Sequence, residues 1–270
     1  PLGRSIAGTE RSLNRTRQRE LAGFHSRHYV SGSTVVVAAG DIRHADLQRL
    51  AKRLAKRMPQ GQRSEWFPAV QQQTRPEICL FTREMEQTQL ALGVRTCSRH
   101  DPRRFAMRLL NAVLGENMSS RLFQSIREEH GLTYSIYSTP NFYHDTGSLT
   151  IAAGLDTANT QKALSLTMTE LRRLRDKAPT AGELRRARDY LIGQLELSLE
   201  STENQMNWVA EQLLGFDKIS PPDQVKKLLH EVRPSDLRRV AQDFFRPERF
   251  CLSLVSPLKS ERRFRKWLEI

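Results

Sequence analysis

The order of the predicted strands and helices narrows the possible folds from residue 77 onward. Strands are predicted over 77–83 and 87–95, and a tight turn joins two more, over 133–143 and 147–154, into an antiparallel hairpin. Helices separate these pairs from each other and from a last strand near the C-terminus. This is not the strict βαβ alternation of a dinucleotide-binding fold. We therefore predict an α+β fold in which helices pack on one face of a mainly antiparallel sheet.

The helices and the last strand are predicted from their hydrophobic patterns, because apolar residues that recur every three or four positions are typical of a helix with one buried face. Helices are predicted over 102–113, 119–130, 157–177, 180–199, 202–214, 221–230 and 235–245, and a strand over 249–255. The three cysteines, Cys79, Cys97 and Cys251, are too few and too scattered for a disulfide framework or a cysteine zinc site. We expect them to be reduced, buried thiols.

The part of the chain before residue 77 has a different composition. Residues 10–28 predict a polar helix, 34–39 a strand, and the region from 44 to 58 an amphipathic helix with a basic outer face. A polar, glutamine-rich stretch follows and is typical of a linker. We therefore divide the chain into a first region over 1–62, a linker over 63–76, a domain over 77–258 and a basic tail over 259–270.

The charge of the chain is strongly positive, with 43 Lys and Arg against 30 Asp and Glu and a formal net charge of +13. Such a charge is typical of proteins that bind nucleic acid or another acidic surface, but solvated Arg-rich helix faces give the same excess. The sequence contains no aromatic RNA-binding motif, no zinc finger and no basic region joined to a heptad zipper. Nucleic acid is therefore a disfavoured partner.

Targeting signals are equally scarce. No apolar run reaches the roughly 18 residues that a membrane-spanning helix needs, so we expect no membrane contact. No charged start followed by an apolar stretch indicates a signal peptide, and the sequence leaves the compartment open. The chain begins with Pro1 rather than Met, which we interpret as a sign that an upstream piece is missing.

Metal-binding motifs are absent from the sequence. One type of zinc peptidase binds the metal with the helical motif H-x-x-E-H. The segment most similar to this motif, I-R-E-E-H over 126–130, has Ile126 in place of the first histidine and ends in His130. His25 and His28 are three residues apart on a predicted helix, but a solvated helix face explains them better than a metal site. The other histidines are scattered and indicate nothing: His44, His100, His144 and His230. The sequence also lacks the glycine-rich phosphate-binding loops and the G-x-S-x-G motif of serine hydrolases.

One segment does point to function. Arg127 lies near the end of a predicted helix and Tyr134 just inside the next strand, and the chain reverses between them at Gly131. The two side chains can therefore converge, and a guanidinium beside a phenol suits peptide carbonyls, a carboxylate or a developing oxyanion. The alternative is that Arg127 pairs with Glu128 or Glu129 while Tyr134 packs at the start of its strand.

This segment, S-S-R-L-F-Q-S-I-R-E-E-H-G-L-T-Y-S-I-Y-S over 119–138, resembles the S-R-L-F…R-E…G-L-x-Y-S signature of the insulinase or pitrilysin type of zinc metallopeptidases. The family includes mitochondrial processing peptidase and bacterial homologues. Other segments resemble the family in the same order along the chain: P-L-G-R…G-T over 1–9, V-V-V-A-A-G-D over 35–41, L-E-S over 199–201 and the stretch 252–257.

The resemblance implies two similar α+β domains that close over an extended peptide, with H-x-x-E-H and zinc in the first. Residues 1–62 would then be the end of the first peptidase-like domain, and 77–258 the complete second one. Zinc is expected in an N-terminal domain that is missing here, so this chain would hold no catalytic residue, metal ligand or cofactor of its own. By position in the motif, Arg127 and Tyr134 would bind substrate, Tyr134 at the scissile carbonyl oxygen and Arg127 at the substrate backbone.

We therefore predict the substrate-binding C-terminal segment of an insulinase-type zinc metalloendopeptidase, inactive in proteolysis by itself. Its partners would be a peptide or unfolded protein substrate and a zinc-bearing N-terminal domain or subunit, in cis or in trans, in a homo- or heterodimer. The alternative is a non-catalytic partner or scaffold subunit of such a peptidase. A basic nucleic-acid-binding protein is the weaker third hypothesis.

Overall fold

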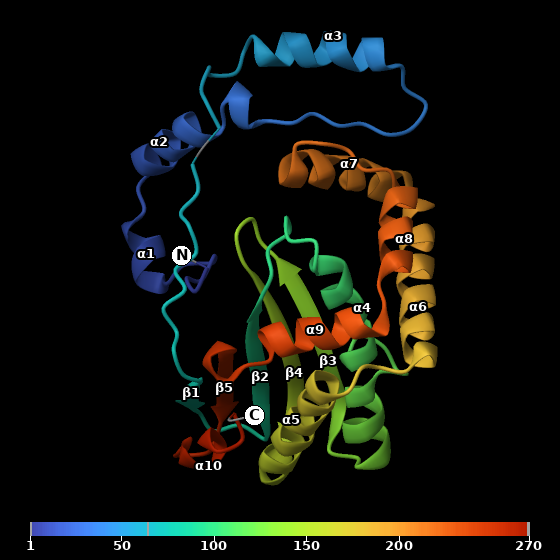
Figure 1. Ribbon diagram of the computed structural model, residues 1–270. Helices are drawn as coiled ribbons and strands as arrows, with labels where there is room; N and C mark the ends of the chain where they lie inside the picture. Colours follow the sequence, from blue (N-terminus) through green and yellow to red (C-terminus); the bar gives the residue numbers. More distant parts are fainter. Residues whose placement is uncertain (1, 64, 269–270) are drawn as a thin grey trace. The chain divides into compact units, whose positions relative to one another are not determined.

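The computed structural model describes residues 2–63 and 65–268 (Figure 1). Pro1, with which the P-L-G-R segment opens, lies outside the described residues, as does the end of the predicted basic tail. The chain forms two compact units, one of residues 1–70 with 197–220 and the other of 71–196 with 221–270. No helix in the described ranges has the length and apolar character that crossing a membrane would require.

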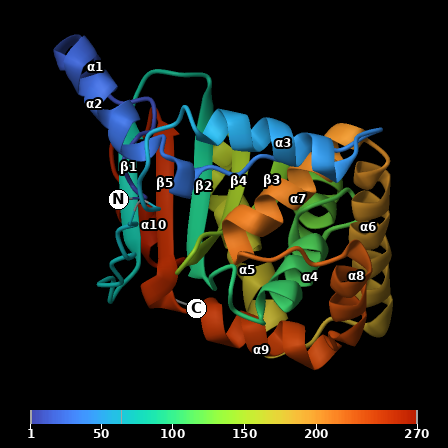
Figure 2. The same cartoon turned by 90° about the horizontal axis from the view of Figure 1, so that it is seen from above.

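The second unit is built on a five-stranded sheet with the strand order β1-β5-β2-β4-β3 (Figure 2). The strands are β1 Glu77–Thr82, β2 Gln87–Thr96, β3 Thr133–Phe142, β4 Gly147–Asp156 and β5 Phe250–Ser256. Three of the four pairings are antiparallel, and only β1 and β5 run parallel. The predicted α+β fold with a mainly antiparallel sheet is confirmed. The first two strands do not form a hairpin, because β5 from the far end of the sequence lies between them.

Helices cover one face of this sheet, as predicted. Figure 1 shows α4 (Arg104–Leu114), α5 (Thr160–Asp176) and α9 (Pro234–Phe244) lying across the same side of the strands. Along β4 every second residue from Gly147 to Leu155 is buried, which is the two-residue period of a strand with one covered face. Leu92, Ile151 and Leu252 are fully buried beneath the helices and form the centre of the core.

Further elements complete the second unit. They are η2 (Phe123–Glu129), η3 (Thr157–Asn159), α6 (Ala181–Leu199), α8 (Pro222–Glu231), η4 (Pro247–Arg249) and α10 (Arg262–Arg265). Arg188 of α6 donates hydrogen bonds to the carbonyl oxygens of Leu229 and Val232, at 3.1 and 2.9 Å, and so ties α8 to α6. Phe264 and Leu268 near the C-terminus are fully buried and belong to the same core.

The first unit consists of helices and extended chain. Its elements are α1 (Glu10–Arg15), α2 (Gln18–His28), η1 (Ser31–Ser33), α3 (His44–Ala55) and α7 (Thr202–Phe216), together with the last residues of α6. The helix predicted over 10–28 is interrupted at Thr16 and Arg17.

The prediction of a strand over 34–39 is wrong: these residues form no strand. A strand needs a neighbour to receive its backbone hydrogen bonds, and the described part of this unit contains no other strand. Val35 and Val36 are consequently exposed, as are Leu50 and Leu54 on the apolar side of α3.

Candidate functional site

The candidate site is built on a helix, a turn and a strand. Residues Phe123–Glu129 form a π-helix, which is wider than an α-helix. π-Helices are rare in proteins, and those that occur are often at functional sites. Its Ile126 is fully buried and anchors it on the core. Gly131 then adopts a left-handed conformation with φ 60°, and Leu132 donates a 3.0 Å hydrogen bond to the Ile126 carbonyl oxygen. This tight reversal leads the chain directly into β3.

The turn brings Arg127 and Tyr134 together. The guanidinium carbon of Arg127 lies 4.8 Å from the centre of the Tyr134 ring and 4.7 Å from that of the Phe123 ring. Both are cation–π contacts, and they restrict where the guanidinium can lie. The Tyr134 side chain itself is 83% exposed. The convergence expected from the sequence is therefore present, and the phenol faces solvent.

The alternative pairing of Arg127 is present as well. Its Nε lies 3.5 Å from Glu128 Oε1, and the Glu128 side chain is about half exposed. An exposed ion pair of this kind contributes little stability, so it does not hold the guanidinium against a competing ligand. Arg127 can thus exchange the carboxylate for a peptide carbonyl without a large cost.

An irregularity in β3 sets the direction of Tyr134. Thr133 pairs with Leu155 and Ser135 pairs with Gly154, so Tyr134 has no partner residue on β4. The Thr133 hydroxyl donates to the Gly154 carbonyl oxygen at 2.5 Å and closes the gap. Bulges of this type re-aim a side chain at the edge of a sheet, and β3 is an edge strand here. Sequence patterns did not indicate this bulge, because it depends on the register of two strands.

A buried polar chain supports the middle of β3. Ser138 donates its backbone N–H to the Gly115 carbonyl oxygen at 2.9 Å and its hydroxyl to Asn111 Oδ1 at 2.7 Å. Asn111 in turn donates from Nδ2 to Glu116 Oε2 at 2.7 Å. A Cβ atom at Gly115 would lie 2.6 Å from Ser138 Oγ, so the turn after α4 approaches β3 as closely as a glycine allows. The strand that carries Tyr134 is therefore fixed against α4.

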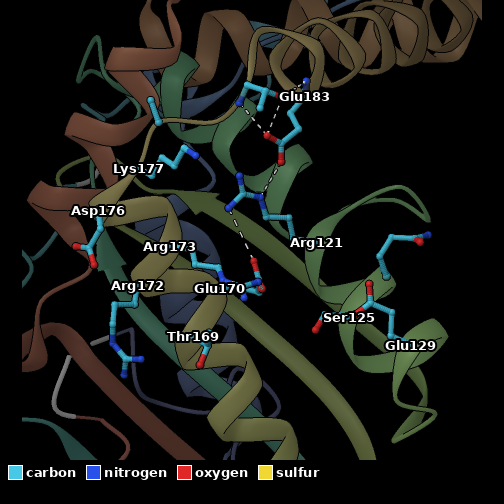
Figure 3. A pocket seen from close by; sticks show the side chains of 13 residues that line it. Arg121, Ser125, Glu129, Thr169, Glu170, Arg172, Arg173, Asp176, Lys177 and Glu183 are labelled. Carbon is cyan, nitrogen blue, oxygen red and sulfur yellow. Dashed lines mark hydrogen bonds and ion pairs between the residues drawn. The ribbon is translucent and has the colours of Figure 1, made fainter.

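A cavity of about 640 Å³ lies on the other side of the same segment, between η2, α5 and the start of α6 (Figure 3). Arg121 Nε lies 2.8 Å from Glu183 Oε1, and Arg121 Nη1 lies 3.8 Å from Glu170 Oε2. The buried Glu170 also binds Arg173 at 2.6 Å. Burial raises the pKa of Glu183, but the hydrogen bonds from Arg121 and Thr180 outweigh it and lower that pKa below its usual value. The charges thus neutralise one another and join three helices.

The residues present do not fit a zinc site of the peptidase kind. Ile126, which stands where H-x-x-E-H has its first histidine, is an aliphatic side chain buried in the core. Within 2–63 and 65–268 no three side chains of His, Cys, Asp or Glu are grouped so that they could hold a metal ion. His25 stacks on Tyr29 and His28 packs against Phe24, so this predicted pair of histidines is occupied by aromatic contacts.

The three cysteines are free thiols in different surroundings. Cys97 is buried, and burial raises the pKa of its thiol to about 11. Cys251 is half-buried, while Cys79 is exposed. The expectation of buried thiols is wrong for Cys79, because it lies on the edge strand β1, on the side of the sheet that helices do not cover.

Comparisons with known proteins agree on one family. The family model described as the peptidase M16 inactive domain matches residues 17–191. An uncharacterized zinc protease of Streptomyces coelicolor is 32% identical over 272 residues, covering 98% of this chain and 59% of the relative. An uncharacterized zinc protease of Bacillus subtilis is also 32% identical, covering 95% of this chain and 62% of the relative. The chain thus spans about three fifths of the length of these relatives.

Solved structures share the fold. The peptidase M16 inactive domain from Pseudomonas fluorescens superposes with a TM-score of 0.85 at 20% identity, covering 96% of this chain and 62% of that one. A chain of Complex III2 from Candida albicans, with Inz-5 bound, superposes with a TM-score of 0.84 at 16% identity, covering 100% of this chain and 66% of that one. The resemblance found in the sequence is confirmed: the chain belongs to the M16, or insulinase-type, peptidase family, of which it contains the C-terminal inactive domain.

Proposed function

We propose that this chain is the substrate-binding part of a zinc metalloendopeptidase and clamps an extended peptide for hydrolysis. The zinc-bearing domain or subunit would be supplied in cis or in trans. Two findings support this: the relatives are named zinc proteases, and the chain spans only about three fifths of their length. The observation that carries the proposal is the exposed Tyr134 phenol, with the Arg127 guanidinium held 4.8 Å from its ring.

The chemistry of the pair suits a peptide backbone. The Tyr134 hydroxyl can donate a hydrogen bond to a carbonyl oxygen, and such a donor is most effective when negative charge develops on that oxygen. Arg127 offers several N–H donors in a fixed plane and would orient neighbouring carbonyls. Because Phe123 and Tyr134 both contact the guanidinium, little side-chain freedom remains to be lost on binding. Zinc chemistry belongs to the other part of the peptidase in this proposal.

The division of the chain is part of the same proposal. Residues 1–62 would be the end of a first peptidase-like domain, 63–76 a linker, 77–258 the second domain and 259–270 a basic tail. The exposed apolar side of α3 and the unpaired Val35 and Val36 support the first assignment, since a larger domain would cover them.

The experiment compares substitutions in the full-length peptidase or its reconstituted complex. For Tyr134→Phe we expect kcat/KM to fall on the order of 100-fold, as for loss of one oxyanion donor, with the melting temperature unchanged. Arg127→Met should raise KM in addition, because a backbone contact in the bound substrate is lost. Tyr143→Phe, at the residue that follows the last residue of β3 and less exposed, is the matched control and should leave both parameters unchanged.

A non-catalytic partner or scaffold subunit is the second candidate. The similarity in fold to a chain of Complex III2 favours it, because that chain is part of a larger assembly. The same variants separate the two proposals. If the assembly retains its peptidase activity with Tyr134→Phe and with Arg127→Met, substrate clamping is refuted and the scaffold function is supported.

A further inference from the structure

Two histidines that are far apart in the sequence meet on the surface of the second unit. His100 lies in the loop between β2 and α4, and His144 lies in the turn between β3 and β4. Their ring nitrogens, His100 Nε2 and His144 Nδ1, are 3.1 Å apart, and the rings stand edge to face. Both side chains are exposed, so an ion in solution can reach them.

The backbone around the two histidines is held in place without them. The residue before His100, Arg99, donates its backbone N–H to the carbonyl oxygen of Tyr143, which precedes His144, at 2.9 Å. The Arg99 guanidinium donates to the Phe142 carbonyl oxygen at 3.2 Å. At Gly147 the β4 backbone packs so closely on Cys97 that a Cβ atom there would overlap the Cys97 carbonyl oxygen. The two imidazoles are therefore presented from a fixed frame, and a ligand would not have to order a loop.

The spacing of the two nitrogens matches that of neighbouring ligands on one metal ion. Imidazole nitrogens bind first-row metals at about 2.0–2.1 Å, so two of them lie about 2.9 Å apart at a right angle and about 3.3 Å apart at the tetrahedral angle. The 3.1 Å separation falls between these values. We propose that His100 Nε2 and His144 Nδ1 together bind a divalent transition-metal ion, with Cu²⁺ bound more tightly than Ni²⁺ or Zn²⁺.

Binding requires a defined protonation state of the two rings. In the hydrogen-bonded pair, one of the facing nitrogens carries the hydrogen and the other accepts it. For both to bind a metal ion, each ring must carry its hydrogen on the opposite nitrogen, Nδ1 of His100 and Nε2 of His144. Starting from two neutral rings, the change is a shift between tautomers followed by a rotation of the rings, and it releases no net proton.

The site differs in kind from the zinc site of a peptidase, which has three protein ligands. Among the described residues no three His, Cys, Asp or Glu side chains form a group that could hold a metal ion, so water would supply the remaining ligands. A two-ligand site of this type holds an exchangeable ion. The inference does not depend on the proposed peptidase function, and an exchangeable ion on His100 and His144 confers no proteolysis.

The test is a titration of the untagged, metal-free protein with Cu²⁺, Ni²⁺ and Zn²⁺ chlorides by calorimetry. The wild type should bind one ion that is lost in His100→Gln/His144→Gln. Each single variant should bind the metal ion more than about tenfold more weakly than the wild type. A loss of this size already follows when only a hydrogen-bond partner of a metal ligand is removed. The control is His25→Gln/His28→Gln, the pair adjacent in sequence, which should retain the ion.

Two further measurements complete the test. The electron paramagnetic resonance spectrum of bound Cu²⁺ should show two nitrogen ligands in the wild type and in the His25/His28 control. Without metal, His100→Gln/His144→Gln should have the same circular dichroism spectrum as the wild type. If this double variant does not fold, His100→Asn/His144→Asn is used in its place. The proposal is overturned if the His100/His144 variant binds the ion as the wild type does, or if the control abolishes binding.

Discussion

Replacing Gly147 with alanine probes a close backbone contact at one end of the sheet. Gly147 is the first residue of β4, between Thr96 of β2 and Phe142 of β3. A Cβ atom there would overlap the Cys97 carbonyl oxygen and lie 2.8 Å from Thr96 Oγ1 and 2.9 Å from the Asn141 carbonyl oxygen. Two of these three neighbours are backbone atoms on opposite sides, so no side-chain rotation relieves the clash.

The expected cost follows from this packing. Overpacking typically destabilises a protein by about 1–3 kcal/mol, and here the backbone of two strands must move, so we expect a loss of about 3 kcal/mol. In a unit of this size each kcal/mol lowers the melting temperature by about 2–4 °C, which gives a decrease of about 6–12 °C. Gly93→Ala in the adjacent β2 is the matched control, because its nearest neighbour would be the Cys251 carbonyl oxygen at 3.6 Å. It should be neutral, or stabilising by about 0.5 kcal/mol.

Thermal unfolding and urea unfolding, both followed by circular dichroism, measure the two variants. If Gly147→Ala lies within about 1 kcal/mol of the wild type, the close approach of β4 to the loop after β2 is refuted. If Gly93→Ala loses as much stability as Gly147→Ala, the cost comes from alanine in a strand and not from the clash. The first outcome would also remove the fixed frame that we describe around His100 and His144.

Three other outcomes are expected. Hydrogen bonds from Arg121 and Thr180 lower the pKa of Glu183, so its ionised form stabilises the second unit at pH values above its ordinary pKa of 4.5. This stabilisation is lost as the pH falls through the lowered pKa. Urea unfolding of Glu183→Gln at several pH values should therefore show a weaker dependence of stability on pH in this range than unfolding of the wild type. Cys79 should react rapidly with a thiol reagent at pH 8, while Cys97 should react only in denaturant, which mass spectrometry of labelled peptides measures. Gly131→Ala should lower the free energy of unfolding by about 1 kcal/mol, since φ 60° is unfavourable for alanine although no atom obstructs its Cβ.

The sequence predicted the features that depend on local patterns. The helices and strands of the second unit alternate buried and exposed positions with their own periods, so most of their bounds differ by only a few residues from the predicted ranges. The meeting of Arg127 and Tyr134 was also accessible, because a single reversal at Gly131 joins them. Their expected roles came from the family resemblance and not from the pattern.

What the sequence could not predict depends on distant partners. The place of β5 between β1 and β2 follows from pairing across the whole domain, and the strand predicted over 34–39 lacks the neighbour that would make it one. The bulge at Tyr134 is a property of the register between β3 and β4. His100 and His144 are separated by 44 residues, and no spacing rule relates them.

The structure also separates the residues of the family signature into those that hold the segment and those that are free to bind. Arg121 at its start forms ion pairs with Glu170 and Glu183, and Ser138 at its end is held in the buried hydrogen-bond chain with Asn111. Leu122 and Ile126 are fully buried between these ends.

Arg127 and Tyr134 lie between the two fixed ends and share an exposed contact. The fixed residues should therefore act through stability. Arg121→Met removes one partner of a largely buried ion-pair network. It should lower the free energy of unfolding by about 3 kcal/mol, which is the lower end of the range for removing one partner of a buried ion pair. Tyr134→Phe leaves packing intact and should cost almost none. If urea unfolding showed equal losses for both variants, Tyr134 would be a packing residue, and its exposed position would not serve a substrate.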